Sequence, residues 1–535
     1  MALTKALAKL TARIAEDIRE QVRRPGPAQE RARSLHRDEK VGEDFIVWTD
    51  VLSRRAAVLW VLKTVYVRVL EDRGLLHPLR LVDPDPKAQE VESEKLFRHL
   101  APNLGPSAYL AWVFRDLSRP RGGLPELFSL QPAEVARPTD ALSQELIQFW
   151  RKTDLETNER IFRFTGEHFD GRLMGDLYQD LDPVVKERYA LLQTPDFVLD
   201  FILDETLTPA IAEWGVEKVR VLDPACGSGH FLLAAFKRLV TGMREKYPER
   251  LVHEVVNDCL ARVVGIDLND YACGLARARL VMTAMELAGE TDLGAASDYH
   301  PQVYWADALE QVERDPEPEQ MGLFTGEVEK KPYNMLTRPE VRARLHPLLR
   351  AGFEVVVGNP PYITEKDAAR REYHKEKVGK VVRYLSASRQ YSLGAPFTER
   401  MFQLAASDGW VGIITANSFM KREFGRALVE KVLPNYSLTK VVDTAGAYIP
   451  GHGTPTVLIV GRNRPAQTKS VLVVMGKRGE PSVPQDPAQG KVWSSIIQGN
   501  NNPSYDSEFV SVSLVERAVL QRHPWSIAGG RGEST

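Results

Sequence analysis

The stretch FEVVVGNPPYI, residues 353–363, joins a run of β-branched residues to a glycine, an asparagine, two prolines and a tyrosine. The apolar run predicts a buried strand. Proline cannot donate to a sheet ladder, and it biases the residue before it toward extended backbone. The strand must therefore end here, which leaves Asn359 and Tyr362 on a stiff loop at its carboxyl end.

Similar short runs rich in β-branched residues alternate with helical segments on both sides of this stretch. They lie between residues 218 and 462 and read KVRVLD, ARVVGID, PQVYWAD, GWVGIITAN, LTKVVDT and TPTVLIVGR. Such alternation predicts an α/β fold with a doubly wound, mainly parallel sheet. Ligands of such sheets bind outside the carboxyl ends of the strands, so those ends are the candidate site.

The length of the chain predicts two or three domains, because 535 residues exceed the usual size of one. The beginning of the chain alternates charged and apolar positions at helical spacing, as in LTKALAKLTARIAEDIREQVRR, where a proline and a glycine follow. We therefore expect a helical domain over residues 1–165. The sheet domain is expected over residues 166–465, and a separate C-terminal segment over residues 466–535.

Composition excludes several classes of protein. The formal net charge of −2 at pH 7 shows no global basic excess, so any surface for nucleic acid must be a local patch. The three cysteines lack metal-ligand spacing and suggest a reducing compartment. The apolar stretch AAVLWVLKTVYVRVL is interrupted by Lys63 and Arg68, which predicts a buried helix and no membrane span. No signal-peptide pattern opens the chain, so we expect a cytoplasmic protein. From the cysteine spacing we expect no metal site.

Three of the predicted strands end in an aspartate. The first runs into DPACGSGH, where Gly227 and Gly229 follow Asp223 and let the backbone approach a ligand. Asp267 in GIDLN can accept from a ribose diol, and Asp307 in YWADAL can accept from an exocyclic adenine amine. Each aspartate alone is also compatible with a helix cap. Since the glycines lack the dinucleotide spacing, the set predicts a pocket for a ligand with ribose and adenine but no phosphates.

With GNPPY as a fourth strand end, the chain resembles a known enzyme family. The order LLQTPDF, DPACGSG, GIDLN, ADAL, GNPPY, GWVGIITANSFMKREFG and GTPTVLIV is similar to that of S-adenosylmethionine-dependent N6-adenine DNA methyltransferases of the γ order. The segments GDLYQDL, ITANSFMKREFG and GAYIPGHGTPTVLIVGRNR resemble more narrowly the BREX-type PglX family of bacterial phage-exclusion systems, with the DISARM adenine methylase as a relative.

The resemblance implies a catalytic role for the loop that ends the opening stretch. An adenine amine is a poor nucleophile because its lone pair is conjugated into the ring. Acceptors on its two N–H groups, the Asn359 side-chain oxygen and the Pro360 carbonyl, would make the lone pair available for in-line attack on the sulfonium methyl. Pro361 would keep these acceptors rigid. Tyr362 would stack on the target base, which must leave the duplex to be reached.

The resemblance also implies the contacts of the cofactor. Asp223 and the backbone from Ala225 to Gly229 would hold the methionine end, Asp267 the ribose and Asp307 the adenine. Cys226 is expected to pack and not to react. A further group of residues is expected to line the same site: Thr194, Pro195, Phe197, Cys226, Gly227, Leu268 and Ala308.

Contacts to DNA are expected from two places. The stretch KDAARREYHKEKVGKVVRYLSASR after the loop holds eight Lys/Arg against three acids, and it can be either a solvated helix face or a phosphate contact. The second place is a base-stacking residue before the last core strand, where Tyr448 is available, the register of the family points to Ile449, and His452 is a third candidate. The phosphate candidates are Lys366, Arg370, Arg371, Lys375 and Lys377.

Other functions stay open at this point. A protein-glutamine or RNA methyltransferase can use the same loop, because it serves other planar amides and amines. A DNA-binding scaffold subunit could keep the core as a cofactor-sensing platform, although the intact Asp223 and NPPY loop argue against a lapsed enzyme. Residues 1–165 contain no convincing nuclease constellation. Residues 466–535 look like the start of a truncated target-recognition region, so the expected partners are double-stranded DNA and other proteins of the same phage-defence system.

Overall fold

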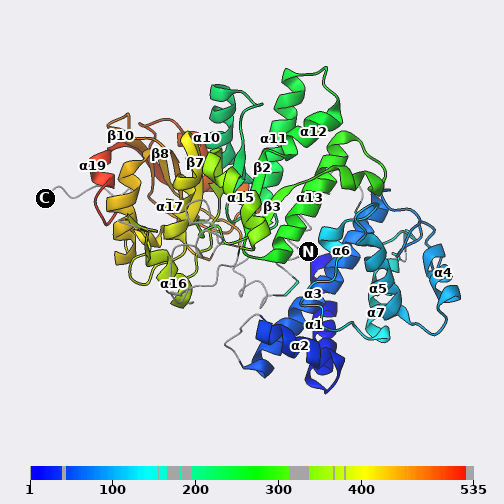
Figure 1. The fold of residues 1–535 in the computed structure, drawn as a ribbon. Helices are drawn as coiled ribbons and strands as arrows, with labels where there is room; N and C mark the ends of the chain where they lie inside the picture. The colour runs from blue at the N-terminus through cyan, green and yellow to red at the C-terminus, as the bar shows by residue number, and fades with distance from the viewer. Residues whose placement is uncertain are drawn as a thin grey trace. The chain divides into compact units, whose positions relative to one another are not determined.

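The chain divides into two compact units in the computed structural model (Figure 1). One unit comprises Met1–Leu191 and Gly274–His300, and the other comprises Leu192–Cys273 and Pro301–Thr535. The structure describes residues 2–38, 44–154, 156–164, 177, 181–182, 194–311, 337–365, 368–378, 381–451 and 453–525.

The described part of the first unit is helical, as the sequence predicted. Its long helix α3 (Phe45–Asp72) is capped by Asp44, whose side chain accepts from the backbone N–H of Ile46 at 2.8 Å. Buried Lys63 of α3 has a counter-charge, because its Nζ lies 2.5 Å from Glu134 Oε2. The other helices are α1 (Ala2–Arg23), α2 (Pro27–Asp38), α4 (Glu92–Leu100), α5 (Pro106–Leu117), α6 (Pro125–Phe128), α7 (Asp140–Arg151), most of α13 (Asp270–Ala288) and η1 (Leu293–Asp298).

The second unit is built on a nine-stranded sheet with the order β11-β10-β8-β9-β7-β4-β1-β2-β3. Strands β9 and β11 run antiparallel to their neighbours, and the other pairings are parallel. Every predicted strand is present, which confirms the α/β fold. The strands are β1 (Val221–Asp223), β2 (Val263–Asp267), β3 (Gln302–Trp305), β4 (Phe353–Gly358), β7 (Ala405–Ala416), β8 (Ser437–Asp443), β9 (Thr456–Arg462), β10 (Ser470–Gly476) and β11 (Val510–Glu516).

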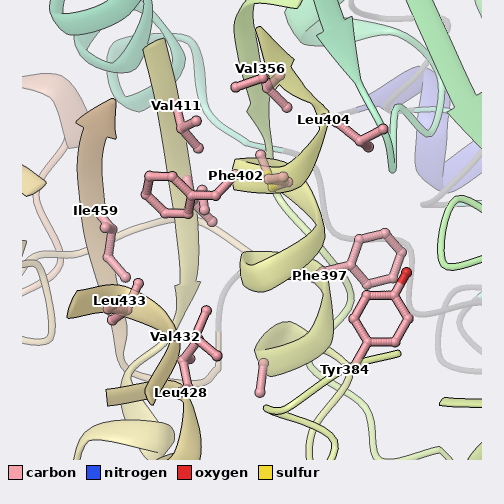
Figure 2. Packing of buried hydrophobic residues seen from close by; sticks show 14 of the residues in the cluster. Val356, Tyr384, Phe397, Phe402, Leu404, Val411, Leu428, Val432, Leu433 and Ile459 are labelled. Carbon is pink, nitrogen blue, oxygen red and sulfur yellow. The ribbon is translucent and has the colours of Figure 1, made fainter. Parts of the chain in front are cut away.

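Helices cover both faces of this sheet. A Cβ on Gly412 of β7 would lie 2.7 Å from Ile202 of α10 (Asp196–Trp214), so α10 packs closely on one face. On β9, Gly461 pairs with Val411, the neighbour of Gly412, and it faces Phe402 of α17 (Gly394–Leu404). Successive strand residues point to opposite faces, so α17 covers the other one. Figure 2 shows the side chain of Phe402 among apolar side chains of the sheet.

The remaining described elements of the second unit are short or lie between the strands. Helices α11 (His230–Lys246) and α12 (Val252–Leu260) precede β2, and α15 (Pro339–Ala351) precedes β4. The others are α16 (Ala368–Lys375), β5 (Lys377–Val378), β6 (Val381–Val382), η2 (Asn417–Met420), η3 (Glu423–Gly425), η4 (Leu428–Val432), η5 (Leu433–Asn435), η6 (Pro487–Gln489), α18 (Lys491–Gly499) and α19 (Arg517–Leu520).

The sheet continues past residue 465, where we expected its domain to end. Strand β10 pairs in parallel with β8, and β11 pairs with β10. The loop after α18 is tied to the sheet by buried Lys440 of β8, whose Nζ lies 2.9 Å from Asn501 Oδ1 and 2.7 Å from Glu205 Oε1 of α10. The segment expected to begin a target-recognition region therefore contributes two strands to this sheet, because its SVLVVMG run is as strongly β-forming as the runs before it.

Two properties concern the whole described chain. None of its helices is both long and apolar enough to cross a membrane. Among the same residues, no group of three or more histidine, cysteine or acidic side chains is placed to hold a metal ion.

Candidate functional site

The predicted site residues come from the carboxyl ends of four neighbouring strands. The sheet order β4-β1-β2-β3 sets the parallel strands side by side. Asp223 ends β1 and Asp267 ends β2, while Asp307 follows β3 by two residues. Asn359 follows β4 directly. The topology therefore brings the three aspartates and the NPPY loop to one edge of the sheet, as expected for a doubly wound fold.

A glycine turn connects β1 to α11 and is bonded to the end of β2. Gly227 has a φ of +51° and Gly229 a φ of +85°, a region that favours glycine over other residues. The Gly227 N–H donates to Asp267 Oδ2 at 2.8 Å, and the Asn269 N–H donates to Asp267 Oδ1 at 2.8 Å. Since a carboxylate has about four acceptor positions, Asp267 can accept a ligand hydroxyl beside its backbone donors.

Asp223 is a buried carboxyl group with a strongly shifted pKa. It is 2% exposed, and its Oδ1 accepts the Ala225 N–H at 3.0 Å. Burial raises the pKa of Asp223 to about 8, with a smaller contribution from the charge of Asp267. Burial also raises the pKa of Asp267. A cationic group placed beside these two carboxyl groups would stabilise their charged forms.

The end of β4 lies directly against this acidic pair. A Cβ on Gly358 would lie 2.9 Å from Asp223 Oδ1, which is closer than real Cβ contacts allow. Any larger side chain would therefore displace Asp223 or the loop. Glycine at this position holds the NPPY loop next to the turn that is expected to bind the methionine end.

The NPPY loop is closed on itself by one hydrogen bond. The Tyr362 hydroxyl donates to Asn359 Oδ1 at 2.6 Å, and burial raises the pKa of Tyr362, which keeps the phenol protonated. The Leu393 N–H donates to the carbonyl of Ile363 at 2.8 Å and fixes the end of the loop. The oxygen expected to accept from a target amine thus already carries an internal donor. Pro360 is buried and Pro361 half-buried beside it.

Asp307 is also engaged by an internal donor. Its Oδ1 accepts the Leu309 N–H at 3.0 Å, and its Oδ2 accepts from Arg370 Nη2 at 2.6 Å. The other end of the guanidinium, Nη1, lies 3.0 Å from Glu365 Oε2. Arg370 is only 14% exposed. The structure therefore places this arginine, expected at DNA phosphates, in an ion pair with the aspartate expected at the adenine.

Helix α16, which carries Arg370, is fixed to the segment after Asp307. The Tyr373 hydroxyl accepts the Gln311 N–H at 3.0 Å. Buried His374 shares a hydrogen bond of 2.8 Å with the Tyr391 hydroxyl, and burial lowers the pKa of His374 to about 4. Sequence reasoning assigned no role to Gln311, His374 or Tyr391. Tyr373, an aromatic residue within the basic run, was the available signal that one side of this helix is buried.

The other candidates for DNA contact differ in exposure. Lys375 and Lys377 are exposed, and Arg371 is half-buried with its Nη1 3.4 Å from the carbonyl of Glu365. Lys366 lies outside the residues that the structure describes.

The candidates for the second base-stacking position also differ. Tyr448 is 37% exposed, whereas Ile449 is buried at 6%. His452 lies outside the described residues. Of the two that are described, Tyr448 is the one accessible to a base.

The remaining predicted cofactor residues differ in their surroundings. Thr194 and Pro195 are buried directly before α10, and the Phe197 ring packs edge-on against Trp493, with centroids 4.8 Å apart. Leu268 is 45% exposed, and its carbonyl accepts from Trp305 Nε1 at 3.0 Å. The buried members of the group are Cys226 and Ala308.

Comparison with known proteins agrees with this arrangement. Residues 261–449 match the Eco57I restriction-modification methylase family. The chain is 37% identical over 525 residues to the adenine-specific methyltransferase PglX of Streptomyces coelicolor, covering 92% of this chain and 42% of that protein. It is 25% identical over 351 residues to the type II methyltransferase M.BstVI of Geobacillus stearothermophilus, covering 63% of this chain and 52% of that protein.

A solved structure of a DrdV–DNA complex has the same fold, with a TM-score of 0.52 and 13% identity over 88% of this chain and 42% of that chain. The chain spans about half, or less, of the length of these relatives. The chain is therefore similar to the adenine-specific methyltransferase PglX, and its residues 261–449 match the Eco57I restriction-modification methylase family.

Proposed function

We propose that this chain transfers a methyl group from S-adenosylmethionine to the N6 amine of adenine in double-stranded DNA. It would act as the modification component of a BREX-like or DISARM-like anti-phage system or of a restriction-modification system. The observation that carries the proposal is the convergence of three strand-end aspartates and an NPPY loop on adjacent parallel strands. A DNA substrate also implies a cytoplasmic location.

The acidic strand ends fit the cofactor by their chemistry. Its methionine end carries a cationic ammonium, and Asp223 is a buried acid with a raised pKa that such a cation would stabilise in its charged form. Asp267 holds its two oxygens on backbone donors and keeps acceptor sites for the ribose hydroxyls. Asp307 would accept from the adenine amine. The cofactor would supply the methyl group as an electrophile on sulfur.

The NPPY loop would act on the target base. Asn359 Oδ1 and the Pro360 carbonyl would accept the two N–H groups of the adenine amine and raise the availability of its lone pair. The amine would then take the methyl group as the S–C bond breaks, leaving a neutral thioether, and would lose a proton to solvent. Tyr362, which now donates to Asn359 Oδ1, would exchange that bond for stacking on the flipped base.

DNA would approach the edge that carries the NPPY loop. The exposed Lys375 and Lys377 would contact phosphates, and Tyr448 would stack on a base. The DrdV structure named above is a DNA complex, which supports a DNA substrate for this fold. Other proteins of the same defence system are proposed partners, because the chain resembles the PglX family of phage-exclusion systems.

The test is the identity of the methylated product. The purified chain would be incubated with tritiated S-adenosylmethionine and, separately, a mixed-sequence DNA duplex, an RNA of the same sequence and a bacterial protein extract. We expect label in the DNA, recovered as N6-methyl-2′-deoxyadenosine after digestion to nucleosides. Label found only in RNA or in protein glutamine would replace the proposal with one of the alternatives. Asn359→Ala serves as the control, because it should bind cofactor but transfer no label.

A further inference from the structure

The acceptor proposed for the cofactor adenine is covered by a side chain of the protein itself. The Asp307 side chain is 4% exposed, and Oδ2 accepts from Arg370 Nη2 at 2.6 Å. Its Oδ1 is held by the Leu309 N–H. A second donor could share Oδ2 only if it could reach that oxygen. Because the side chain is almost fully buried with Arg370 against it, the Arg370 guanidinium must turn away before an adenine amine can approach Oδ2.

The position of Arg370 in the chain limits which groups its guanidinium can reach after it leaves Asp307. It lies in the first turn of α16, five residues after Glu365 and eight after Tyr362. The exposed Lys375 and Lys377 follow at the other end of the helix. A guanidinium released from Asp307 therefore adds a positive charge to the side of the site that the target base and its phosphates must reach.

We propose that Arg370 is a cofactor-responsive switch: its guanidinium pairs with Asp307 until the cofactor adenine takes that carboxylate, and it then moves to a DNA phosphate. This inference rests on the proposed role of Asp307 in the methyltransferase site. By linkage, cofactor would then strengthen DNA binding, and DNA would strengthen cofactor binding by the same factor.

The neighbouring acceptor is covered in the same manner. Asn359 Oδ1 accepts from the Tyr362 hydroxyl at 2.6 Å. Tyr362 and Arg370 both follow β4. One stretch of chain therefore supplies the donors to Asn359, the acceptor for the target base, and to Asp307, the acceptor for the cofactor.

The first experiment measures binding of S-adenosylhomocysteine, which carries the same adenosine, to wild type, Arg370→Ala and Arg250→Ala by calorimetry. Arg370→Ala removes the competitor and leaves Asp307 without its partner, so we expect about tenfold tighter binding, the worth of one charge-assisted hydrogen bond. Arg250→Ala breaks an ion pair with Asp258 elsewhere on the same unit and should bind as wild type does. Unchanged or weaker binding by a folded Arg370→Ala protein would overturn the switch and make Arg370 a fixed wall of the pocket.

The second experiment uses the wild-type chain and no variant. Binding of a mixed-sequence duplex to the wild-type chain is measured at several salt concentrations, with and without saturating S-adenosylhomocysteine. One added phosphate contact steepens the slope of log affinity against log salt by about 0.9. An identical slope with and without the ligand would contradict the release of Arg370.

A third variant separates the switch from the proposed function. Asp307→Ala should bind S-adenosylhomocysteine at least about tenfold more weakly than wild type, because the adenine amine loses its acceptor. Wild-type affinity in Asp307→Ala would overturn the assignment of the pocket itself. Weak binding in Asp307→Ala together with unchanged binding in Arg370→Ala would overturn only the switch.

Discussion

Replacement of Asp223 by asparagine tests the electrostatics of the site. The side chain keeps its shape and can still accept the Ala225 N–H through its amide oxygen, but it loses the carboxyl group that titrates. The pKa of Asp223 rises from an ordinary 3.8 to about 8 on burial in the fold. Between these values the unfolded chain carries an ionised carboxylate, whereas the folded chain keeps the proton.

The sign of the effect follows from this difference in protons bound. The contribution of Asp223 to stability is present below pH 4 and is lost as the pH rises toward 8, by about 1.4 kcal/mol per pH unit. From pH 5 to pH 7 the wild type should therefore lose about 3 kcal/mol of unfolding free energy relative to Asp223→Asn. The cofactor affinity of wild type should rise over the same range, because a cationic ligand favours the ionised carboxylate, and the variant should lack this rise.

The assay is urea denaturation at pH 5, 6 and 7, with calorimetry of S-adenosylmethionine at the same pH values. Comparison of the two proteins cancels the titration of the ligand amine and of other groups. Asp200→Asn, at an exposed acid paired with Arg238, is the control and should follow the wild-type profile. Parallel stability and affinity profiles for wild type and Asp223→Asn would refute the argument that burial holds a proton on Asp223.

Substitutions at three further positions test the rest of the site. Asp267→Ala should weaken cofactor binding in calorimetry by about 1–3 kcal/mol, because two backbone donors and the ribose lose their acceptor; unchanged affinity would contradict the ribose assignment. Gly358→Ala should lower the melting temperature and the cofactor affinity together, since its Cβ would lie 2.9 Å from Asp223 Oδ1, whereas Gly453→Ala meets nothing within 4 Å and should change neither. Tyr362→Phe should retain methyl transfer to DNA, whereas Tyr362→Ala should lose about 1–3 kcal/mol of stacking in kcat/KM; equal rates in the two variants would exclude a stacking role.

The fold, and the end of the sheet at which the site lies, could be predicted because both depend on local sequence patterns. Runs of β-branched residues mark buried parallel strands, and the carboxyl ends of such strands share one edge whatever the lengths of the connections. Asp223, Asp267 and Asn359 were placed by this reasoning alone. The sheet does not end at residue 465 as predicted, because β10 adds to it in parallel and β11 then adds in the antiparallel direction. The alternating polar and apolar residues of β11 resemble those of a surface segment.

The partners of the site residues could not be predicted in the same way. Arg370 stands in a run of basic residues, and its ion pair with Asp307 joins positions 63 residues apart in the sequence. The hydrogen bond between Tyr362 and Asn359 depends on the path of a loop with two prolines. Neither contact leaves a periodic signal, since the first is decided by how α16 packs on the segment after β3 and the second by the path of the loop.

The most direct test of the account is the methylome of cells that express the wild-type protein, Asn359→Ala or no protein. Genomic DNA would be sequenced by a single-molecule method that detects N6-methyladenine, and the purified Asn359→Ala protein would be checked for cofactor binding. The account predicts N6-methyladenine in a recurring sequence context with the wild type alone, together with cofactor affinity of the variant within about threefold of wild type, since Asn359 acts on the base. The same methylated adenines in cells with Asn359→Ala would contradict it.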